Sequence, residues 1–458
     1  MTPLIHPAPG AAMSDVLILG AGFSRALSER MPLTNELGNL ALDQARLYLA
    51  TPPPDFQKGD FEAWLSRLAD DQPDLLPEEN LENRARFVRL SRAIRTVLDT
   101  RQAEALAGGV PSWLDELLGT IHVRRIPVLT LNYDTLVEHT VQRLRLSTWT
   151  GGTATWHDIL DHLPPLLPGW LGVDRNPDTF RLIKLHGSLN WLISQDVESA
   201  QVLRWSDLTV DPDDAMRRAP ATDPFVVPPS AAKSPYYRIP FVRQLWRRAA
   251  AALRSASYVA LLGYSVPEAD LVVSGMLRDA CEDRGVRLEV VNLDNSADQI
   301  MARLKTVMAG RAEVVRLNPG PDPIERWSNQ YRDTASRELG EAIADVEPPD
   351  GPELPVLVAW SESRCAAVIR VEHDGSTGDT KLQLERADQL LRVARQRETH
   401  EDKPVQVRAL TEVHSRGRRI VAVDADGNEL VLVAATYLDK SVLERPKWQV
   451  LVPCAWPA

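Results

Sequence analysis

The sequence predicts an α/β protein whose core is a doubly wound, mostly parallel sheet of the Rossmann type, followed by a small α+β domain rich in strands. Three observations predict it. Short apolar runs recur along residues 15–319, stretches with helical spacing lie between them, and the composition changes after a proline-rich segment at residues 347–355. Strands separated by helices need crossover connections, which place the strands parallel in one sheet.

Six apolar runs are the expected strands of this sheet. The first is continuously apolar and ends in glycine, which is typical of a strand covered on both faces. The runs lie at residues 16–19, 128–131, 182–185, 258–262, 288–292 and 313–317. Apolar residues at helical spacing between them, as at residues 113–118 and 270–281, predict the crossover helices.

We expect one core domain at residues 15–345, preceded by a loose tail at residues 1–14 and interrupted by two insertions. The first insertion, at about residues 35–120, is predicted to be mostly helical because Phe87, Leu90, Ile94 and Leu98 recur at helical spacing. The second, at about residues 187–254, mixes tryptophans with prolines and is expected to be a loop-rich lid or subdomain.

Residues 346–355 have the composition of a linker, and residues 356–458 are expected to form a regulatory or interaction domain. Runs at residues 420–423 and 430–433 flank an Asp-Gly pair and predict a hairpin. Residues 424–428 also imitate the start of a calcium loop, but Ala435 stands where the bidentate glutamate belongs, which favours the turn. A charged helix is expected to carry Leu382, Leu390, Leu391 and Val393.

Composition excludes several classes of protein. Lys and Arg total 52 against 63 Asp and Glu, and the net charge of −11 opposes direct binding to nucleic acid. No apolar stretch approaches the ~18 residues of a membrane-spanning helix, and the first dozen residues do not form a secretory signal. Three cysteines far apart in the sequence cannot form a disulfide framework or a four-cysteine zinc site. We therefore expect a cytoplasmic protein without zinc.

The first strand ends in Gly-Ala-Gly-Phe-Ser at residues 20–24. Glycines at such a turn let the backbone approach a pyrophosphate, which the following helix start can bind. Arg25 occupies the place of the third glycine of the dinucleotide fingerprint, and no second strand with a terminal acid follows, which disfavours a dehydrogenase. On its own, this loop is also compatible with a tight turn that binds nothing.

The other expected strands also end in polar or glycine residues. These residues are Asn132 and Asp134, His186, Gly263 and Ser265, and Asn292. The carboxyl ends of parallel strands meet at one edge of the sheet, where open α/β sheets bind their ligands. A P-loop ATPase is disfavoured because its lysine motif is missing, and the segment after residue 263 lacks the second glycine of a nucleophile elbow.

This ordered set resembles the sirtuin-like superfamily of NAD-consuming enzymes and, within it, the bacterial sirtuin-like NAD hydrolases of antiphage defence. The resemblance covers residues 15 to about 318. Its most specific parts are Gly-Ala-Gly-Phe-Ser at 20–24, Asn-Tyr-Asp at 132–134 and His-Gly-Ser-Leu-Asn-Trp at 186–191.

The resemblance implies NAD+ as the substrate and assigns a role to each motif. Asn132 is expected to lie against the nicotinamide ribose and position a water, while His186 hydrogen-bonds ribose hydroxyls or acts as base. Asp134 braces the loop on the nicotinamide side. The remaining expected NAD+ contacts are Gly20, Ala21, Gly22, Phe23 and Ser24 at the phosphates and Gly263, Ser265 and Asn292 at the phosphate–adenosine half.

Two departures disfavour protein deacylation. Sirtuin deacylases carry two Cys-x-x-Cys pairs after the His-Gly motif, whereas residues 187–254 contain no cysteine. Leu131 also stands where deacylases typically have glutamine. Cleavage of NAD+ needs few groups, because nicotinamide leaves as a neutral base and needs no general acid. An amide that orients water and an imidazole that accepts a proton are sufficient.

The predicted function is therefore that of an NAD+ glycohydrolase that releases nicotinamide and ADP-ribose. The resemblance implies an antiphage effector that depletes NAD+ once triggered, working as a homo-oligomer or beside a partner such as a motor ATPase or a short Argonaute. Two alternatives stay open. One is a non-catalytic sensor of NAD+ or ADP-ribose, and the other is an NAD-dependent transfer enzyme, either a protein deacylase or an ADP-ribosyltransferase.

Overall fold

The computed structural model describes residues 14–46, 61–124, 126–144, 180–194, 222–230, 233–268, 270–281 and 285–344. It also describes short pieces at residues 149–150, 153–154, 202–204 and 208, and the strands between residues 356 and 455. Residues 1–13 of the expected tail, the linker at 346–355 and residues 425–428 of the turn that imitates a calcium loop lie outside the described residues. Ser14 and Asp424 belong to strands.

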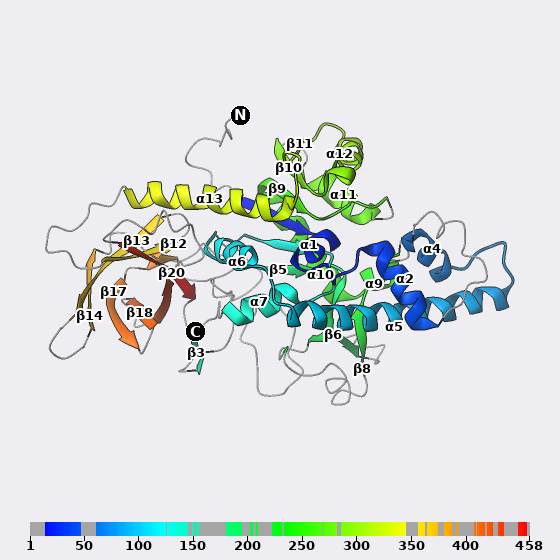
Figure 1. The fold of residues 1–458 in the computed structure, drawn as a ribbon, viewed down its shortest axis with the longest axis horizontal. Coiled ribbons are helices and arrows are strands. Elements are labelled where there is room, and N and C mark those ends of the chain that lie inside the picture. The colour runs from blue at the N-terminus through cyan, green and yellow to red at the C-terminus, as the bar shows by residue number, and fades with distance from the viewer. Residues whose placement is uncertain are drawn as a thin grey trace.

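A parallel sheet of six strands forms the core (Figure 1). Its strands are β1 (Ser14–Leu19), β2 (Val128–Thr130), β5 (Leu182–Lys184), β9 (Ala256–Leu262), β10 (Val286–Val291) and β11 (Ala312–Arg316). They lie in the order β11-β10-β9-β1-β2-β5, and every neighbouring pair is parallel. Numbered along the chain, this is the order 3-2-1-4-5-6 of a Rossmann sheet. The predicted fold class is confirmed, and the direction of winding reverses between β1 and β9.

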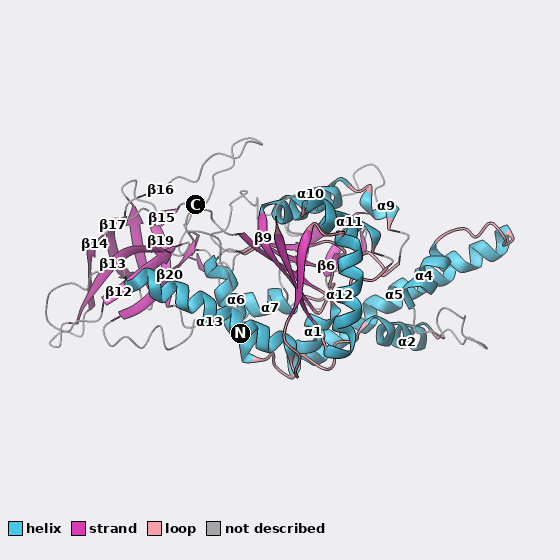
Figure 2. Cartoon of the chain, turned by 90° about the horizontal axis from the view of Figure 1, so that it is seen from above, coloured by secondary structure: helices cyan, strands magenta, loops and turns pink. Residues whose placement is uncertain are grey.

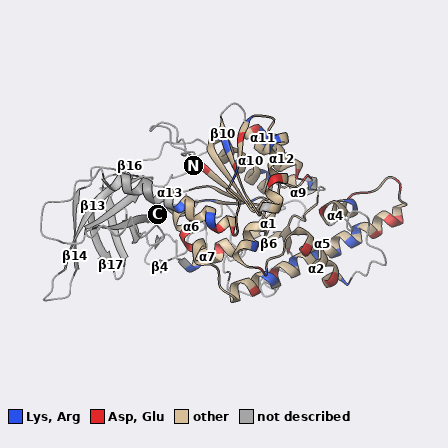
Figure 3. Ribbon diagram, turned by 45° about the horizontal axis from the view of Figure 1, so that its top comes forward, with Lys and Arg blue, Asp and Glu red and all other residues tan. Residues whose placement is uncertain are grey.

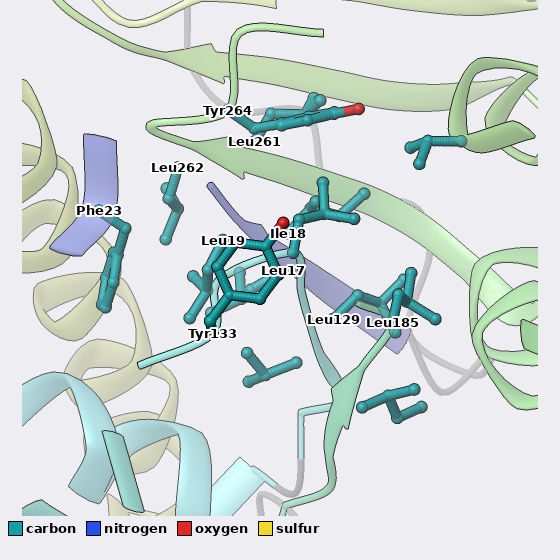
Figure 4. Close-up of a cluster of buried hydrophobic side chains, with 14 of the residues drawn as sticks. Leu17, Ile18, Leu19, Phe23, Leu129, Tyr133, Leu185, Leu261, Leu262 and Tyr264 are labelled. Atoms are coloured by element: carbon teal, nitrogen blue, oxygen red, sulfur yellow. The ribbon is translucent and has the colours of Figure 1, made fainter. Parts of the chain in front are cut away.

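Helices cover both faces of this sheet (Figure 2). α10 (Pro240–Ser255) contacts β1, β5 and β9 on one face. The other helices that follow or connect the strands are α1 (Ala21–Leu27), α6 (Ser112–Arg124), α7 (Leu136–Leu144), α11 (Leu271–Ala280), α12 (Asp294–Met308) and α13 (Pro323–Ala344). Because both faces are covered, most side chains of the inner strands are buried, among them Leu17, Ile18 and Leu261 (Figure 4).

The first insertion is helical where it is described. It consists of α2 (Thr34–Ala45), α4 (Phe61–Ala69) and α5 (Pro77–Ala107). Glu79 accepts a hydrogen bond from the Leu76 N–H at 2.8 Å and so satisfies a backbone donor at the start of α5. Charged residues of both signs occur along this long helix (Figure 3). Residues 77–89 are mostly exposed. From Leu90 onward the helix buries one face, which includes Leu90, Ile94 and Leu98, as their spacing predicts.

The second insertion differs from the loop-rich segment that the sequence led us to expect. β6 (Gly187–Ser194) pairs in an antiparallel sheet with β7 (Val202–Arg204) and β8 (Thr222–Val226), and α9 (Ser234–Tyr237) precedes α10. Gly187 turns the chain from β5 into β6 with a φ of +82°, a region that favours glycine. A Cβ there would lie 2.3 Å from the carbonyl oxygen of Phe225, so the turn and β8 require glycine at this position.

The C-terminal strands form a separate seven-stranded sheet in the order β14-β13-β12-β20-β19-β18-β17. These strands are β12 (Val356–Ser361), β13 (Arg364–His373), β14 (Thr380–Arg386), β17 (Leu410–Arg416), β18 (Arg419–Asp424), β19 (Glu429–Ala434) and β20 (Trp448–Ala455). The antiparallel pair β18–β19 confirms the predicted hairpin. Two further short pairs are β3 (Trp149–Thr150) with β4 (Thr153–Ala154), and β15 (Leu391–Arg392) with β16 (Val407–Arg408).

The prediction of a charged helix around residues 382–393 is wrong. Leu382 lies in β14 and Leu391 lies in β15, whereas Leu390 and Val393 fall outside the described residues. The reason is local: Leu382 and Leu384 alternate with polar residues at the period of a strand.

No helix in the described part of the chain is long and apolar enough to cross a bilayer.

Candidate functional site

The glycine turn after β1 packs directly against the loop after β9, at the point where the winding of the sheet reverses. A Cβ on Gly20 would lie 2.5 Å from the Cα of Tyr264, and one on Gly22 would lie 2.8 Å from the Cα of Gly263. Gly263 itself has a φ of +63°. Glycine is therefore required on both sides of this contact, and the two segments predicted to bind NAD+ lie against each other.

Backbone hydrogen bonds join this turn to its neighbours. The Gly20 N–H donates to the Leu262 carbonyl at 3.1 Å, and the Gly22 N–H donates to the Gly263 carbonyl at 2.9 Å. The Phe23 N–H donates to the Gly20 carbonyl at 2.9 Å, and the Phe23 ring is buried edge-on against Trp113. Phosphate binding by the Gly22 and Phe23 amides stays a prediction, and it requires these two bonds to be exchanged for bonds to the ligand.

Asn132 lies just beyond β2, with its side chain directed at the glycine turn. Its Nδ2 donates to the Gly20 carbonyl at 2.8 Å and to the Ser24 hydroxyl at 2.9 Å. A backbone carbonyl only accepts hydrogen bonds, so the atom that faces it is the amide nitrogen. Both N–H bonds of the amide are thus engaged. What Asn132 can offer a ligand or a water is its Oδ1, as an acceptor.

Ser24 and Asp134 hold this amide in place. The Ser24 hydroxyl, itself an acceptor for Asn132, donates to Asp134 Oδ2 at 2.6 Å, and both residues are buried. The other carboxylate oxygen of Asp134 accepts from the Leu136 N–H at the start of α7. Asp134 therefore braces the segment that carries Asn132 through side-chain bonds to two elements.

Lys184 also holds the segment that carries Asn132 and Asp134. The sequence analysis did not identify this lysine as a site residue. Its ammonium group is buried, pairs with Glu138 at 2.8 Å and donates to the Asp134 carbonyl at 2.5 Å. Burial raises the pKa of the Glu138 carboxyl although Lys184 lowers it. The sequence contained a signal for this role, because a lysine inside an apolar strand is expected to be buried and then needs a charged partner.

His186 lies one strand further along the same edge of the sheet. Thr130 of β2 pairs with Lys184 of β5, so Asn132 and His186 each lie two residues beyond a matched pair of neighbouring strands. Such strands are about 4.8 Å apart. His186 is 4% exposed, and its Nε2 has no hydrogen-bond partner among the described residues. Buried polar atoms in proteins nearly always have a partner, so this unpaired nitrogen is a candidate to bind a ligand atom at the edge where open α/β sheets bind their ligands.

The imidazole of His186 is held neutral. Its pKa falls to about 3, first because of burial and then because of the charge of Lys233, whereas Asp270 acts in the opposite direction. The ring lies 6.3 Å from that of Trp246 on α10, which in turn contacts Tyr237. A neutral imidazole with an unpaired nitrogen is able to accept a hydrogen bond, and so low a pKa makes it a weak base at neutral pH.

A buried charged cluster lies beside His186, and it too was missed. Lys233 pairs with Asp270, and its ammonium lies 3.7 Å from Glu62 of α4. The Tyr264 hydroxyl donates to the second oxygen of Asp270 at 3.2 Å. The cluster therefore joins the helical insertion, the segment before α9 and the loop after β9. Nothing in the local pattern around Lys233 or Glu62 predicts this meeting, because the three segments are far apart in the sequence.

The residues expected at the adenosine half lie at the ends of β9 and β10. Asn292 is half-buried, and its Nδ2 donates to the Tyr264 carbonyl at 3.4 Å. Ser265 is exposed, and its carbonyl accepts from Arg303 of α12 at 3.1 Å. The bond from Asn292 thus joins the loop after β10 to the loop after β9, which carries Gly263 and Ser265.

The structure brings the predicted site residues to one edge of the sheet. Gly20, Ser24, Asn132 and Asp134 form one hydrogen-bonded unit, Gly263 contacts it, and His186 follows on the adjacent strand. Among the residues that the structure describes, no group of three or more His, Cys, Asp or Glu side chains is arranged to hold a metal ion.

No protein-family profile and no curated protein matches this chain. Solved structures are similar to it at low identity. A SIR2 structure in complex with the inhibitor EX-527, 2′-O-acetyl-ADP-ribose and a deacetylated p53 peptide is 14% identical, covers 70% of this chain and 93% of its own, and has a TM-score of 0.30. A SIR2–p53 peptide–NAD+ structure is 13% identical over 71% of this chain and 94% of its own, also at 0.30. At such a score the Rossmann assignment rests on the strand order of the six-stranded sheet.

Proposed function

We propose that this protein is an NAD+ glycohydrolase that cleaves NAD+ to nicotinamide and ADP-ribose. One observation carries the proposal. Asn132, its two N–H bonds engaged by Gly20 and Ser24, offers an acceptor oxygen one strand away from the unpaired nitrogen of His186. A site that only bound a dinucleotide would not need a fixed amide and a neutral imidazole at neighbouring positions.

The glycine turn supports the same proposal from the phosphate side. Gly20 and Gly22 lie at the reversal point of the sheet, where doubly wound sheets bind nucleotides. NAD+ lying across this edge would have its pyrophosphate at the turn after β1 and its adenosine near Asn292. Its nicotinamide ribose would then lie toward Asn132 and His186.

The reaction follows from the groups present. The bond between C1′ of the ribose and the nicotinamide nitrogen breaks, and its electron pair stays on nicotinamide, which leaves uncharged. Water adds to C1′ and releases one proton. The Oδ1 of Asn132 accepts a hydrogen bond from this water and orients it, while Nε2 of His186 accepts a hydrogen bond from a ribose hydroxyl. The proton that the water releases passes to the solvent. No group has to protonate the leaving base.

The test is nicotinamide release from NAD+, followed by chromatography, with Asn132→Ala and His186→Gln. Each variant is expected to lose about a hundredfold or more in rate, the usual contribution of a positioned acid–base group. His139→Gln is the matched control, because His139 lies half-buried in α7, outside the site. Calorimetry with NAD+ separates binding from turnover. Variants as fast as the wild type would remove both assignments.

We further propose that the activity serves antiphage defence by depleting NAD+ when a trigger arrives. The proposal rests on the resemblance of the motifs at residues 20–24, 132–134 and 186–191 to defence NAD hydrolases. A homo-oligomer or a protein partner, such as an ATPase or a short Argonaute, would then restrain the site until infection. Cellular NAD+ measured after phage infection tests this role: it should fall in cells with the wild type and not in cells with Asn132→Ala.

A further inference from the structure

The N-terminal half of α5 (residues 77–92) packs on one side only. It extends past the six-stranded sheet to one end of the molecule, where α4 contacts it (Figure 1, Figure 2). The side that packs carries Asn83 and Phe87, which are half-buried, and then Leu90 and Ile94, which are buried. A surface helix with one buried face is expected to be polar on the opposite face.

The opposite face of this half-helix carries an apolar stripe instead. Leu81 and Val88 are 66% and 48% exposed, and Ala85, which lies between them, is exposed as well. The three residues are spaced by four and three positions, so they align along the helix on the side away from Ile94. Single apolar residues on a surface need no explanation, but an aligned set at this spacing is typical of a contact between two helices.

Charged residues flank the stripe in an order that is complementary to itself. Glu78 precedes the stripe and Arg92 follows it, each seven positions from Ala85, and both are exposed. Seven positions are close to two helical turns, so both charges lie on the face of the stripe. If two copies of this helix pair antiparallel about a two-fold axis at Ala85, Glu78 of each copy faces Arg92 of the other. Leu81 then lies opposite Val88, and each of these contacts occurs twice.

A second pair of charges fits the same axis. Glu82 and Arg89 are exposed and lie three and four positions from Ala85 on its two sides, so the axis brings them together between copies. Glu82 lies 3.2 Å from Arg86 of its own helix, an exposed pair of the kind that contributes little to stability. Two charge pairs and one apolar contact thus agree on one register. Because the pattern is complementary to itself when reversed, the partner that it fits is a second copy of this chain.

We propose that the N-terminal half of α5 is a homodimer interface, in which residues 78–92 of two copies pair antiparallel with Ala85 at the two-fold axis. The proposal goes beyond the proposed function and uses no property of the NAD+ site. A contact of this symmetry closes on itself, so it produces dimers and not open filaments.

Sedimentation velocity of the full chain over a micromolar range of concentrations, without NAD+, tests the proposal. The wild type is expected to dimerise. Glu78→Arg and Arg92→Glu each place like charges opposite one another twice, and each should raise the Kd of the dimer about tenfold or more. The double variant Glu78→Arg/Arg92→Glu restores opposite charges and should dimerise as the wild type does. Glu104→Arg, near the other end of α5, is the matched control and should leave the Kd unchanged.

An equal mixture of the two single variants tests the antiparallel arrangement. The Glu78→Arg chain carries arginine at both positions, and the Arg92→Glu chain carries glutamate at both. One chain of each kind should therefore form a heterodimer at concentrations where neither variant alone dimerises. A parallel pairing would bring position 78 against position 78 and would give no such dependence on the double exchange.

Cross-linking tests the register. In Ala85→Cys the two thiols lie at the axis and should form a disulfide between chains under mild oxidation, whereas Glu104→Cys and the wild type should not. Circular dichroism shows that each variant is folded. A wild type that stays monomeric, folded single variants that dimerise as tightly as the wild type, or Ala85→Cys chains that do not cross-link would each overturn the proposal.

Discussion

Replacing Ser24 with alanine should weaken both the fold and the catalytic arrangement. The Ser24 hydroxyl donates to Asp134 Oδ2 at 2.6 Å and accepts from Asn132 Nδ2 at 2.9 Å. In Ser24→Ala, a buried carboxylate oxygen loses its donor and one N–H of the amide loses its acceptor. Asn132 keeps its bond to Gly20 but becomes free to tilt about it.

The magnitude follows from these two losses. An unsatisfied buried group costs about 1–3 kcal/mol, and a charged one lies at the upper end, so we expect a destabilisation of about 3 kcal/mol. With a urea dependence of about 3 kcal/mol per molar, the midpoint of unfolding should fall by about 1 M. The tilting amide should lower kcat about tenfold, which corresponds to about 1.4 kcal/mol in the barrier.

Urea unfolding followed by tryptophan fluorescence measures the first effect, and nicotinamide release measures the second. Ser91→Ala in α5 is the control, because its hydroxyl bonds only a carbonyl of its own helix, at 2.9 Å. That control should shift stability by less than about 0.5 kcal/mol. Equal midpoints for the two variants, or an unchanged kcat in Ser24→Ala, would refute the reasoning.

Three further predictions concern other parts of the site. Gly263→Ala should lower the melting temperature by several degrees in a thermal scan, because its Cβ would lie 2.2 Å from the Phe23 nitrogen, whereas Gly275→Ala, with open space around it, should not. The kcat/KM for NAD+ should stay flat from pH 8 down to about pH 5, since the pKa of His186 lies near 3 and the neutral form persists; an acid limb near pH 6.5 would contradict this. Lys184→Met leaves the buried Glu138 without its cation and should destabilise the protein by about 3–5 kcal/mol in urea; an unshifted midpoint would contradict it.

The sequence predicted the sheet well because β1, β2 and β5 are short runs whose residues are buried and mostly apolar, whereas β11 at the edge is only partly buried. The strand order could be anticipated only as a class, yet it determines that the ends of β1 and β9 meet. The sequence analysis was wrong for β14. Leu382 and Leu384 recur at the period of a strand, whereas the analysis places Leu382 on a helix. The sequence analysis also did not predict the antiparallel strands of the second insertion, because β6 and β8 pair although they are distant in the chain.

The residues of the candidate site also fall into two groups, those that the sequence could locate and those that it could not. Residues that follow strands directly, such as Asn132 and His186, could be located from the pattern alone. Lys233, Asp270 and Glu62 could not, because they come from a loop, a helix start and an insertion, and only tertiary packing brings them together. Sequence periodicity reports which face of an element is buried; it does not report which distant charge lies opposite.

The dispersal of the site along the chain has a consequence for synthesis. Gly20 and Asn132 are separated by 112 positions, and Gly263 lies beyond the midpoint of the 458-residue polypeptide. Until β9 has been synthesised, a nascent chain lacks the loop at Gly263, against which Gly20 and Gly22 pack. For an enzyme of the proposed kind, a chain that ends before β9 would therefore lack the complete site.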